Sequence, residues 1–550
     1  DEDNSSRKKH KNEKKKMFKG QNKSRGPTFK QSKENTLCPI LVDVKKGDTT
    51  PVCHYDNCKF IHDVQSYLSC KPPDLGHNAM YLISKVTALV VSLAGKTAFQ
   101  FHLLLFSLIF VSEKSSKTST TQSFTKELQR ALQKRTYNFE KSERIISAVK
   151  DGKIDLPSKA KSMSQSEQKA DVSVGSKEQL GPVSDTDLIK LRPAEKKKID
   201  WTDKLYLSPL TTVGNLPFRR ICKEFGADIT CGEMALATSL LQGRKQEWAL
   251  AKRHESEDLF GAQICGSNMN TMTRCAQVLQ ENANIDFVDI NLGCPIDLIF
   301  QKGAGSGLLR QEKILKSVVV SMNQVLDIPL TVKVRTGIHK DKKIADQLVP
   351  KFRDWGVSLI TLHGRTREQR YTRSADWGYI EKCAQLCKPV PLFGNGDILS
   401  FSDYNTAREI CPSIAGTMIG RGALIKPWIF TEIKEQRDWD ISSSERFDII
   451  KKYSNYGLEH WGSDTQGVEN TRKFLLEWLS FFHRYIPYGL LENPPHQINQ
   501  RPPMFKGRDD LETLLASPNC ADWIRITEML LGKVPDGFNF LPKHKANSWK

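Results

Sequence analysis

Short apolar runs alternate with longer stretches of helical periodicity between residues 205 and 419. Runs of this kind, rich in Val, Ile, Leu and Phe, are typical of buried parallel strands. They predict strands at Leu205–Leu207, Asp228–Met234, Leu259–Cys265, Phe287–Asn291, Leu330–Arg335, Leu359–His363, Pro391–Gly394 and Gly416–Ile419. The stretches between them predict helices, including Met269–Asn282, Ile344–Trp355 and Phe401–Ile410.

This succession of strand-then-helix units predicts an α/β fold, a (β/α)8 TIM barrel over residues 196–435. A doubly wound sheet is the alternative, but the Gly-x-Gly-x-x-Gly expected after its first strand is absent. Residues 436–550 predict a C-terminal helical domain, with helices at Thr471–Tyr485 and Asp522–Leu531. One apolar face of the first helix carries Leu475, Leu476, Leu479 and Phe482.

Polar residues dominate most of the chain before the barrel. Residues 1–36 hold twelve Lys or Arg against five Asp or Glu, so we expect a disordered basic tail. Residues 76–195 predict a disordered linker, with helical character at Glu127–Val149. The apolar run 79–112 inside it is interrupted by lysines and too short to span a bilayer. A buried helix or an aberrant insert is therefore favoured over a membrane helix, and no membrane partner is expected.

A cysteine and histidine cluster lies within residues 37–75. Cys38 is followed by Cys53-x4-Cys58-x3-His62, and three thiolates with one imidazole can close a tetrahedral zinc site. Zinc fingers of this CCCH type commonly bind RNA, where exposed aromatic side chains stack on bases. The alternative is a set of unrelated cysteines and a surface histidine.

Charge and cysteine usage narrow the class of partner and the compartment. Lys and Arg total 82 against 63 Asp and Glu, a formal charge of +19 that favours a polyanionic partner such as RNA, DNA or an acidic membrane. Thirteen scattered cysteines fit reduced intracellular thiols better than a disulfide framework. No secretory signal peptide is apparent, so we expect a nuclear or cytoplasmic protein, and a monomer.

The chemistry of a barrel lies at the C-terminal ends of its strands. The loops after strands seven and eight frequently form a phosphate site, and here they carry Gly396, Gly420 and Arg421. Glycine lets the backbone approach a ligand closely, and the arginine adds a fixed positive fork. These residues indicate a phosphorylated ligand, of which flavin mononucleotide (FMN) is one. Lys333 suits the pyrimidine edge of a flavin, which Gln263 and His363 could also contact.

A single cysteine stands at the tip of the strand Phe287–Asn291. Cys294 lies between Gly293 and Pro295, and the glycine-rich segment 302–307 follows closely. A thiol at a strand end beside glycine backbone suits a reactive group that faces a ligand. The alternative is a buried thiol next to an ordinary turn.

Several motifs, taken together, resemble the tRNA-dihydrouridine synthases. They are Ser208–Thr211, Asn291–Pro295, Val332–Arg335, His363–Arg365, Asn395–Asp397 and Gly420–Gly422. The downstream segments Leu475–Leu479 and Phe540–Asn547, with the upstream finger, resemble the eukaryotic branch that acts on uridine 47 of tRNA. That branch carries a second finger after the first, and here the cysteine-free run from Ala79 to Val111 stands in its place.

The resemblance implies a flavin barrel followed by a helical domain that holds tRNA. NADPH would reduce FMN, the flavin would give hydride to C6 of uracil, and Cys294 would protonate C5. The FMN ligands implied are Pro209, Leu210, Thr211, Gln263, Lys333, His363, Asn395, Gly396, Asp397, Gly420 and Arg421. A free thiol is mostly protonated at neutral pH, so Cys294 can act as a general acid without tuning.

Gripping structured RNA requires cations outside the catalytic cavity, because the target base must leave its stack. Candidates in the C-terminal domain are Arg472, Lys473, Arg484, Arg501, Lys506 and Arg508. Two other functions stay open at this point. One is an RNA-binding protein with a catalytically silent barrel, and the other is a flavin barrel that acts on a free pyrimidine.

Overall fold

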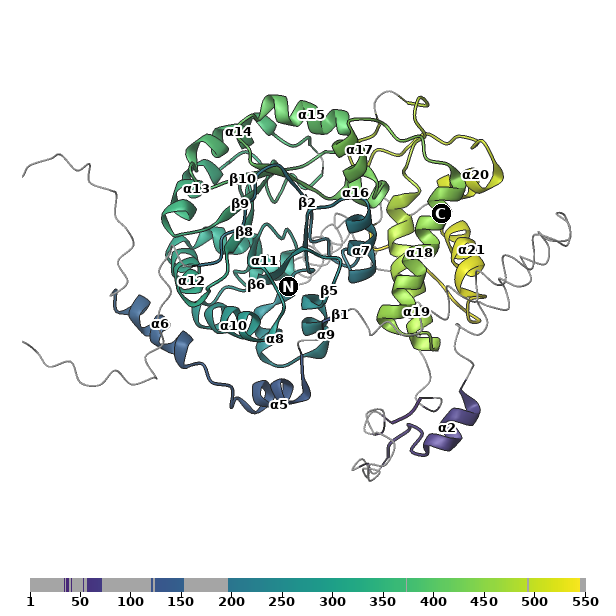
Figure 1. The fold of residues 1–550 in the computed structure, drawn as a ribbon, viewed down its shortest axis with the longest axis horizontal. Coiled ribbons are helices and arrows are strands. Elements are labelled where there is room, and N and C mark those ends of the chain that lie inside the picture. Colours follow the sequence, from purple (N-terminus) through teal and green to yellow (C-terminus); the bar gives the residue numbers. More distant parts are fainter. Residues whose placement is uncertain are drawn as a thin grey trace, which may run out of the picture.

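The computed structural model describes residues 34, 36–38, 41, 53, 57–71, 120–121, 124–152, 196–371, 373–491 and 494–544. The apolar run 79–112 lies outside the described residues, as does almost all of the basic tail 1–36. Predictions made for those segments therefore stay predictions. The described chain forms a barrel with a group of helices beside it (Figure 1).

Eight parallel strands close into a barrel, because β11 pairs with β2 and β3 joins β2 to β6. In chain order they are β2 Lys204–Leu207, β3 Ile229–Cys231, β6 Leu259–Cys265, β7 Phe287–Leu292, β8 Leu330–Arg335, β9 Leu359–His363, β10 Leu392–Asn395 and β11 Gly416–Ile419. Each overlaps a predicted strand, and the (β/α)8 barrel is confirmed. A two-residue strand, β4 Ala235–Leu236, adds to β6.

The helices that cover the barrel alternate with its strands (Figure 1). They include α7 Leu216–Glu224, α8 Ala237–Leu241, α9 Lys245–Trp248, α10 Met269–Asn282, α12 Glu312–Val325, α13 Ala345–Asp354, α14 Trp377–Leu386, α15 Phe401–Ile410 and α17 Ile429–Glu435. Two shorter helices, α11 Asp297–Gln301 and α16 Arg421–Ile425, lie in the loops after β7 and β11.

Aromatic side chains fill the barrel at the end where its strands begin. The Trp201 ring lies 5.5 Å from Phe287 and 6.5 Å from Phe393, measured between ring centroids. Tyr206 packs against the same two rings and is buried with them. Because this end is closed by packing, the space for a ligand lies at the other end, where the strands finish.

The helical region, residues 436–544, contains α18 Ser443–Trp461, α19 Thr465–Phe482, α20 Asp510–Ala516 and α21 Cys520–Leu531. Helix α18 starts with a capping box between Ser442 and Glu445. The region packs on α7 and α16, where Trp478 Nε1 donates to the Leu424 carbonyl at 2.9 Å (Figure 1). Barrel and helical region share one apolar core here.

The single helical stretch predicted at Glu127–Val149 is two helices, α5 Lys126–Lys134 and α6 Glu140–Lys150. Arg135 has a positive φ of 59°, which ends α5, and Asn138 Oδ1 accepts from the Glu140 amide at the start of α6. Leu128 and Ile146 are buried against the barrel helices. Just before α5, β1 Thr120–Thr121 pairs with β5 Arg253–His254.

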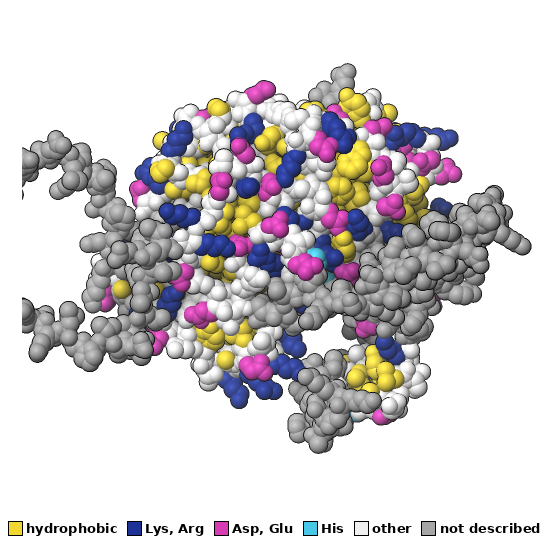
Figure 2. Space-filling view, in the orientation of Figure 1, with side chains coloured by type: hydrophobic (Ala, Val, Ile, Leu, Met, Phe, Trp, Pro, Cys, Tyr) yellow, Lys and Arg dark blue, Asp and Glu magenta, His cyan; other side chains and the backbone are white. Residues whose placement is uncertain are grey.

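Two features of the surface bear on partners. Within the described ranges, no helix combines the length and the apolar character needed to cross a membrane. Figure 2 shows Lys and Arg side chains interspersed with Asp and Glu over the face turned to the viewer. The described residues visible on this face therefore form no continuous basic track for a polyanion.

Candidate active site and zinc centre

A cavity of about 280 Å³ opens where the barrel strands end. Parallel strands bring their carboxyl ends to one side, so residues far apart in the sequence meet there. Cys294 lines this cavity together with most of the predicted cofactor residues, namely Pro209, Leu210, Thr211, Lys333, His363, Asn395, Gly396, Asp397, Gly420 and Arg421. We call it the mouth cavity.

Gln263 is the predicted cofactor residue that does not line the mouth cavity. It is 1% exposed, and its Nε2 donates to Asp289 Oδ2 at 2.8 Å. Its Oε1 accepts from Asn291 Nδ2 at 2.8 Å. Gln263 therefore lies below the cavity. It influences the cavity indirectly, by holding the side chain of Asn291, which lines it.

The loop that carries Cys294 is held by its neighbours. Asn291 Oδ1 accepts from the backbone amides of Gly293 and Cys294, at 3.1 and 2.8 Å, and Ser306 Oγ donates to the Cys294 carbonyl at 2.7 Å. Gly305 has a φ of +57°, and a Cβ there would come within 3.0 Å of Cys294 Cβ. The glycine-rich segment thus gives the cysteine room.

The Cys294 thiol is 8% exposed, and burial raises its pKa. The positive charges of Arg335, Lys543 and Arg367 act in the opposite direction, favouring the thiolate. The result is a thiol that keeps its proton at neutral pH, with cations nearby that can stabilise the anion once the proton has left.

A half-buried cation, Lys333, lines the cavity. Lys333 Nζ lies 3.2 Å from Asn395 Oδ1. Burial, assisted by Arg335, lowers the pKa of Lys333 to about 8, and Asp289 opposes the shift. Burial also places the pKa of His363 well below its usual value, so this imidazole is neutral at physiological pH.

Asp397 orients two arginines at the rim. Arg365 Nη2 donates to both of its carboxylate oxygens, at 2.5 and 2.6 Å, and Arg421 Nη2 donates to one of them at 2.7 Å. Arg421 also lies over the Tyr371 ring, 4.6 Å from its centroid. One carboxylate against two guanidinium groups leaves a net positive charge here.

Gly396 shows why this rim needs glycine. Its φ is +139°, and a Cβ at this position would lie 2.5 Å from Ala375 Cβ. Any other residue would push the loop after β10 away from its place beside Asp397.

The far wall of the mouth cavity comes from the helical region, through Glu477, Phe481, Ile498, Lys543 and His544. No site role was predicted for these residues, nor for Tyr371 and Met234, which line the barrel side. Lys543 and His544 belong to the motif Phe540–Asn547, which could have drawn attention to them. Tyr371 lies in a loop without a local signal.

The four predicted zinc ligands come together. The ligand atoms of Cys38, Cys53, Cys58 and His62 all lie within 4.8 Å of one another. The Cys38 and Cys53 sulfurs are 3.8 Å apart, close to the roughly 3.8 Å separation that tetrahedral coordination by Zn–S bonds of about 2.3 Å requires. Cys70 lies outside this cluster, exposed on α2 Val64–Cys70.

Residues 206–480 match the family model described as dihydrouridine synthase (Dus). A relative from Xenopus laevis, named tRNA-dihydrouridine(47) synthase [NAD(P)(+)]-like, is 54% identical over 98% of this chain and 84% of its own. This chain belongs to the dihydrouridine synthase family. The human relative of the same name is 50% identical, over 97% of this chain and 85% of its own.

Membership of the dihydrouridine synthase family confirms the predicted class, an oxidoreductase. Among solved structures, "Morphinone reductase" aligns with 45% of this chain and 91% of its own at 10% identity. The TM-score of 0.32 is too low to add to the description of the fold.

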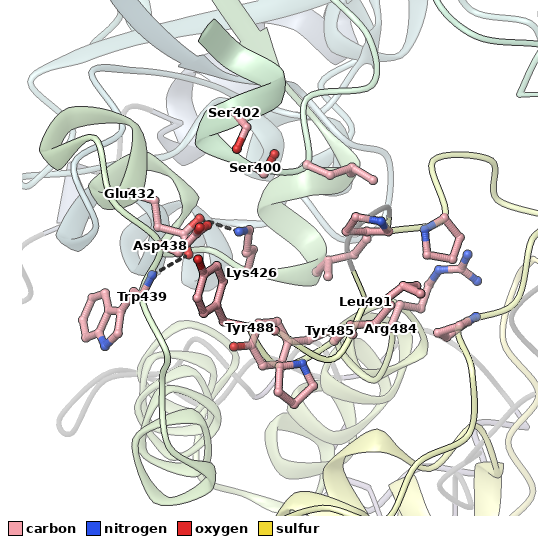
Figure 3. Close-up of a pocket in the computed structure, with 18 residues that line it drawn as sticks. Ser400, Ser402, Lys426, Glu432, Asp438, Trp439, Arg484, Tyr485, Tyr488 and Leu491 are labelled. Atoms are coloured by element: carbon pink, nitrogen blue, oxygen red, sulfur yellow. Dashed lines mark hydrogen bonds and ion pairs between the residues drawn. The ribbon is translucent and has the colours of Figure 1, made fainter. Parts of the chain in front are cut away.

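A second cavity, of about 430 Å³, lies between the barrel loops and the helical region of this synthase (Figure 3). Both cations among the described residues that line it are engaged by protein oxygens. Lys426 contacts Glu432, and Arg484 Nη2 donates to the Gln500 carbonyl at 2.6 Å. Figure 3 shows Glu432 accepting from the Trp439 amide as well. The charge of Lys426 is thus neutralised by the carboxylate of Glu432.

Three cations predicted to meet RNA phosphates have structural contacts instead. Arg472 is fully buried and donates to Thr527 Oγ1 and to the carbonyls of Leu531 and Gly532. Arg484 is buried, as described above. Arg508 forms ion pairs with Asp440 and Glu512. Arg501 and Lys506 are exposed, and Lys473 is half-buried.

Proposed function

We propose that this chain reduces uridine to 5,6-dihydrouridine in tRNA, at position 47, with FMN as cofactor and NAD(P)H as reductant. The observation that carries the proposal is the shared cavity of Cys294, Lys333 and Arg421. The names of the relatives, tRNA-dihydrouridine(47) synthases, support the substrate and the position.

The residues of the mouth cavity fit FMN. Arg421, with the backbone of Gly396 and Gly420, would hold the phosphate, since a guanidinium group offers several donors in a fixed fork. Lys333 and Asn395 would face the pyrimidine edge of the ring system. When bound and reduced, the flavin supplies the hydride that C6 of uracil accepts.

Cys294 completes the two-electron reduction with a proton. Hydride addition at C6 leaves a negative charge on the uracil ring. Transfer of the Cys294 thiol proton to C5 neutralises this charge. The thiolate that remains is stabilised by Arg335, Lys543 and Arg367, and it regains its proton from solvent. The ring of His363 is neutral, so it adds no charge beside the half-buried ammonium group of Lys333, which contacts Asn395.

The zinc site would serve tRNA binding rather than the chemistry. Cys38, Cys53, Cys58 and His62 would hold one zinc ion and fix the fold of a finger. A finger of this type adds contacts to single-stranded or looped RNA.

Cys294→Ala tests the proposal. We expect the variant to form no dihydrouridine in tRNA while NADPH still reduces its bound flavin at the wild-type rate. Full dihydrouridine formation by Cys294→Ala would overturn the acid assignment.

Two further measurements separate the alternatives. Purification without flavin would favour a silent RNA-binding protein, and turnover of free uridine but not tRNA would favour a small-molecule enzyme.

A further inference from the structure

The motif at the C-terminal end of the described chain reaches the catalytic cavity. Phe540 is 2% exposed and packs against Trp523, with ring centroids 6.5 Å apart. Three residues later the Lys543 amide donates to Glu477 Oε2 at 3.2 Å. The next ring, His544, lies 5.9 Å from the Phe481 ring. The segment is thus anchored in the helical region and delivers two side chains to the mouth cavity.

The Lys543 side chain bridges the helical region and the barrel. Its Nζ lies 3.2 Å from Thr212 Oγ1, in the loop after β2. The backbone of Thr212 is fixed in turn, since its φ is 80° and its amide donates to Glu233 Oε2 at 2.5 Å. The ammonium group is near enough to Cys294 and Glu233 to favour the charged form of each. Lys543 and Cys294 line the same cavity, so a nucleotide held there can contact both side chains.

Lys543 differs from Arg365 and Arg421 in its partners. Arg365 and Arg421 share Asp397, and Arg335 donates to the carbonyls of Gly293 and Thr366. Within the described residues, the side-chain hydrogen bond of Lys543 goes to a neutral hydroxyl. Like Lys333, which donates to the Asn395 amide oxygen, it forms no ion pair with a carboxylate among the described residues, so its charge is available to an incoming anion.

The proposed reaction brings two phosphates to this cavity, one on the cofactor and one on the nucleotide. Arg421 and the glycines of the rim take the first. The second must lie on the cysteine side, because C5 of the uracil has to meet the Cys294 thiol and a nucleotide's phosphate is one sugar away from its base.

We propose that Lys543 binds the phosphate of the target nucleotide and so positions the uracil ring against Cys294. This inference rests on the proposed function and adds a substrate contact to it. Because Lys543 belongs to the helical region and Cys294 to the barrel, this contact requires the two to be docked.

Lys543→Met in the full chain tests the inference, with Lys543→Arg as the charge-retaining variant. We expect Lys543→Met to weaken tRNA binding about 5- to 20-fold and to reduce the slope of log Kd against log salt by about one. Lys543→Arg should restore most of the affinity. Flavin content and reduction of the flavin by NADPH should stay near wild type. Lys451→Met, an exposed lysine of α18, is the matched control.

Two outcomes would overturn the inference. One is a tRNA affinity and salt slope for Lys543→Met equal to those of Lys451→Met. The other is an unchanged affinity with a slower saturated rate, which would place Lys543 at the developing charge of the ring instead. Failure of the proposed function looks different, because wild-type protein would then form no dihydrouridine whatever its tRNA affinity. A melting temperature and flavin content equal to wild type establish that Lys543→Met is folded.

Discussion

The carboxylate of Asp289 accepts a hydrogen bond from Gln263 Nε2 at 2.8 Å beneath the mouth cavity. A carboxylate can only accept, so it fixes the orientation of the Gln263 amide and turns Oε1 toward Asn291. Asn291 must then present its own oxygen to the amide of Cys294. One buried carboxylate thus determines the polarity of a chain of amides that ends at the proposed acid.

Removing that carboxylate should destabilise the barrel. Asp289→Leu leaves the donors of Gln263 and Thr331 without their acceptor, at a cost of about 1–3 kcal/mol each. We expect the free energy of unfolding to fall by about 2–5 kcal/mol in urea titrations of the flavin-free protein. Asp289→Asn should lose less, because Asn can accept from Gln263 and donate to Thr331. Equal urea midpoints for Asp289→Leu and wild type would contradict this account.

FMN affinity should depend on pH through Lys333, whose pKa lies at about 8 because of burial. The charged form of a group with a lowered pKa is lost as pH rises through that value. The ammonium fraction should thus fall from about nine-tenths at pH 7 to about one-tenth at pH 9, raising the apparent Kd for FMN up to about tenfold. Quenching of flavin fluorescence measures this. Lys333→Arg stays charged and should give a flat profile, and a flat wild-type profile would refute the prediction.

Metal analysis should find about one zinc ion per chain. Cys58→Ser should lose the zinc and weaken tRNA binding, because it removes one of the four clustered ligands. FMN content should not change, since the mouth cavity is built without the cluster. Cys70→Ser is the matched control, being an exposed cysteine outside the cluster. Zinc retained in Cys58→Ser at the wild-type ratio would argue against this ligand set.

Arg472→Met should act on stability rather than on RNA contact. The guanidinium group is buried and pairs with Glu469, so its loss leaves a buried carboxylate and several carbonyls without a donor. We expect a loss of about 3–5 kcal/mol in unfolding free energy, with the tRNA affinity of the folded protein unchanged. Thermal unfolding and filter binding measure the two quantities. Lys473→Met should leave stability nearly unchanged, and a reversed pattern would restore Arg472 as a phosphate contact.

The barrel was predictable because its strands are buried on both faces. Runs such as Phe287–Asn291 and Leu359–His363 are mostly apolar, and that pattern is visible without any knowledge of neighbours. The residues that follow each run lie at one end of the barrel, so Cys294, Lys333 and Arg421 could be placed together in advance. The break at Arg135 could not, because only its positive φ distinguishes it from a continuing helix.

Contacts between distant segments were out of reach of the sequence. Arginine is usually a surface residue, and nothing in the sequence around Arg472 indicates otherwise. Its burial follows from the docking of α21 on α19. Gln263 has the right place at a strand end, yet Asp289 draws it below the cavity. Lys543 meets Thr212 across 331 positions of sequence, and no local pattern encodes such a pairing.

The shared core of α7, α16 and α19 ties the barrel to its neighbour thermodynamically. Phe218 of the barrel lies 5.3 Å from Trp478, and both are fully buried. Cutting the chain between the two would expose this aromatic surface on each fragment, which favours aggregation over independent folding. The barrel and the helical region should therefore melt in one cooperative step, so loosening either one unfolds both.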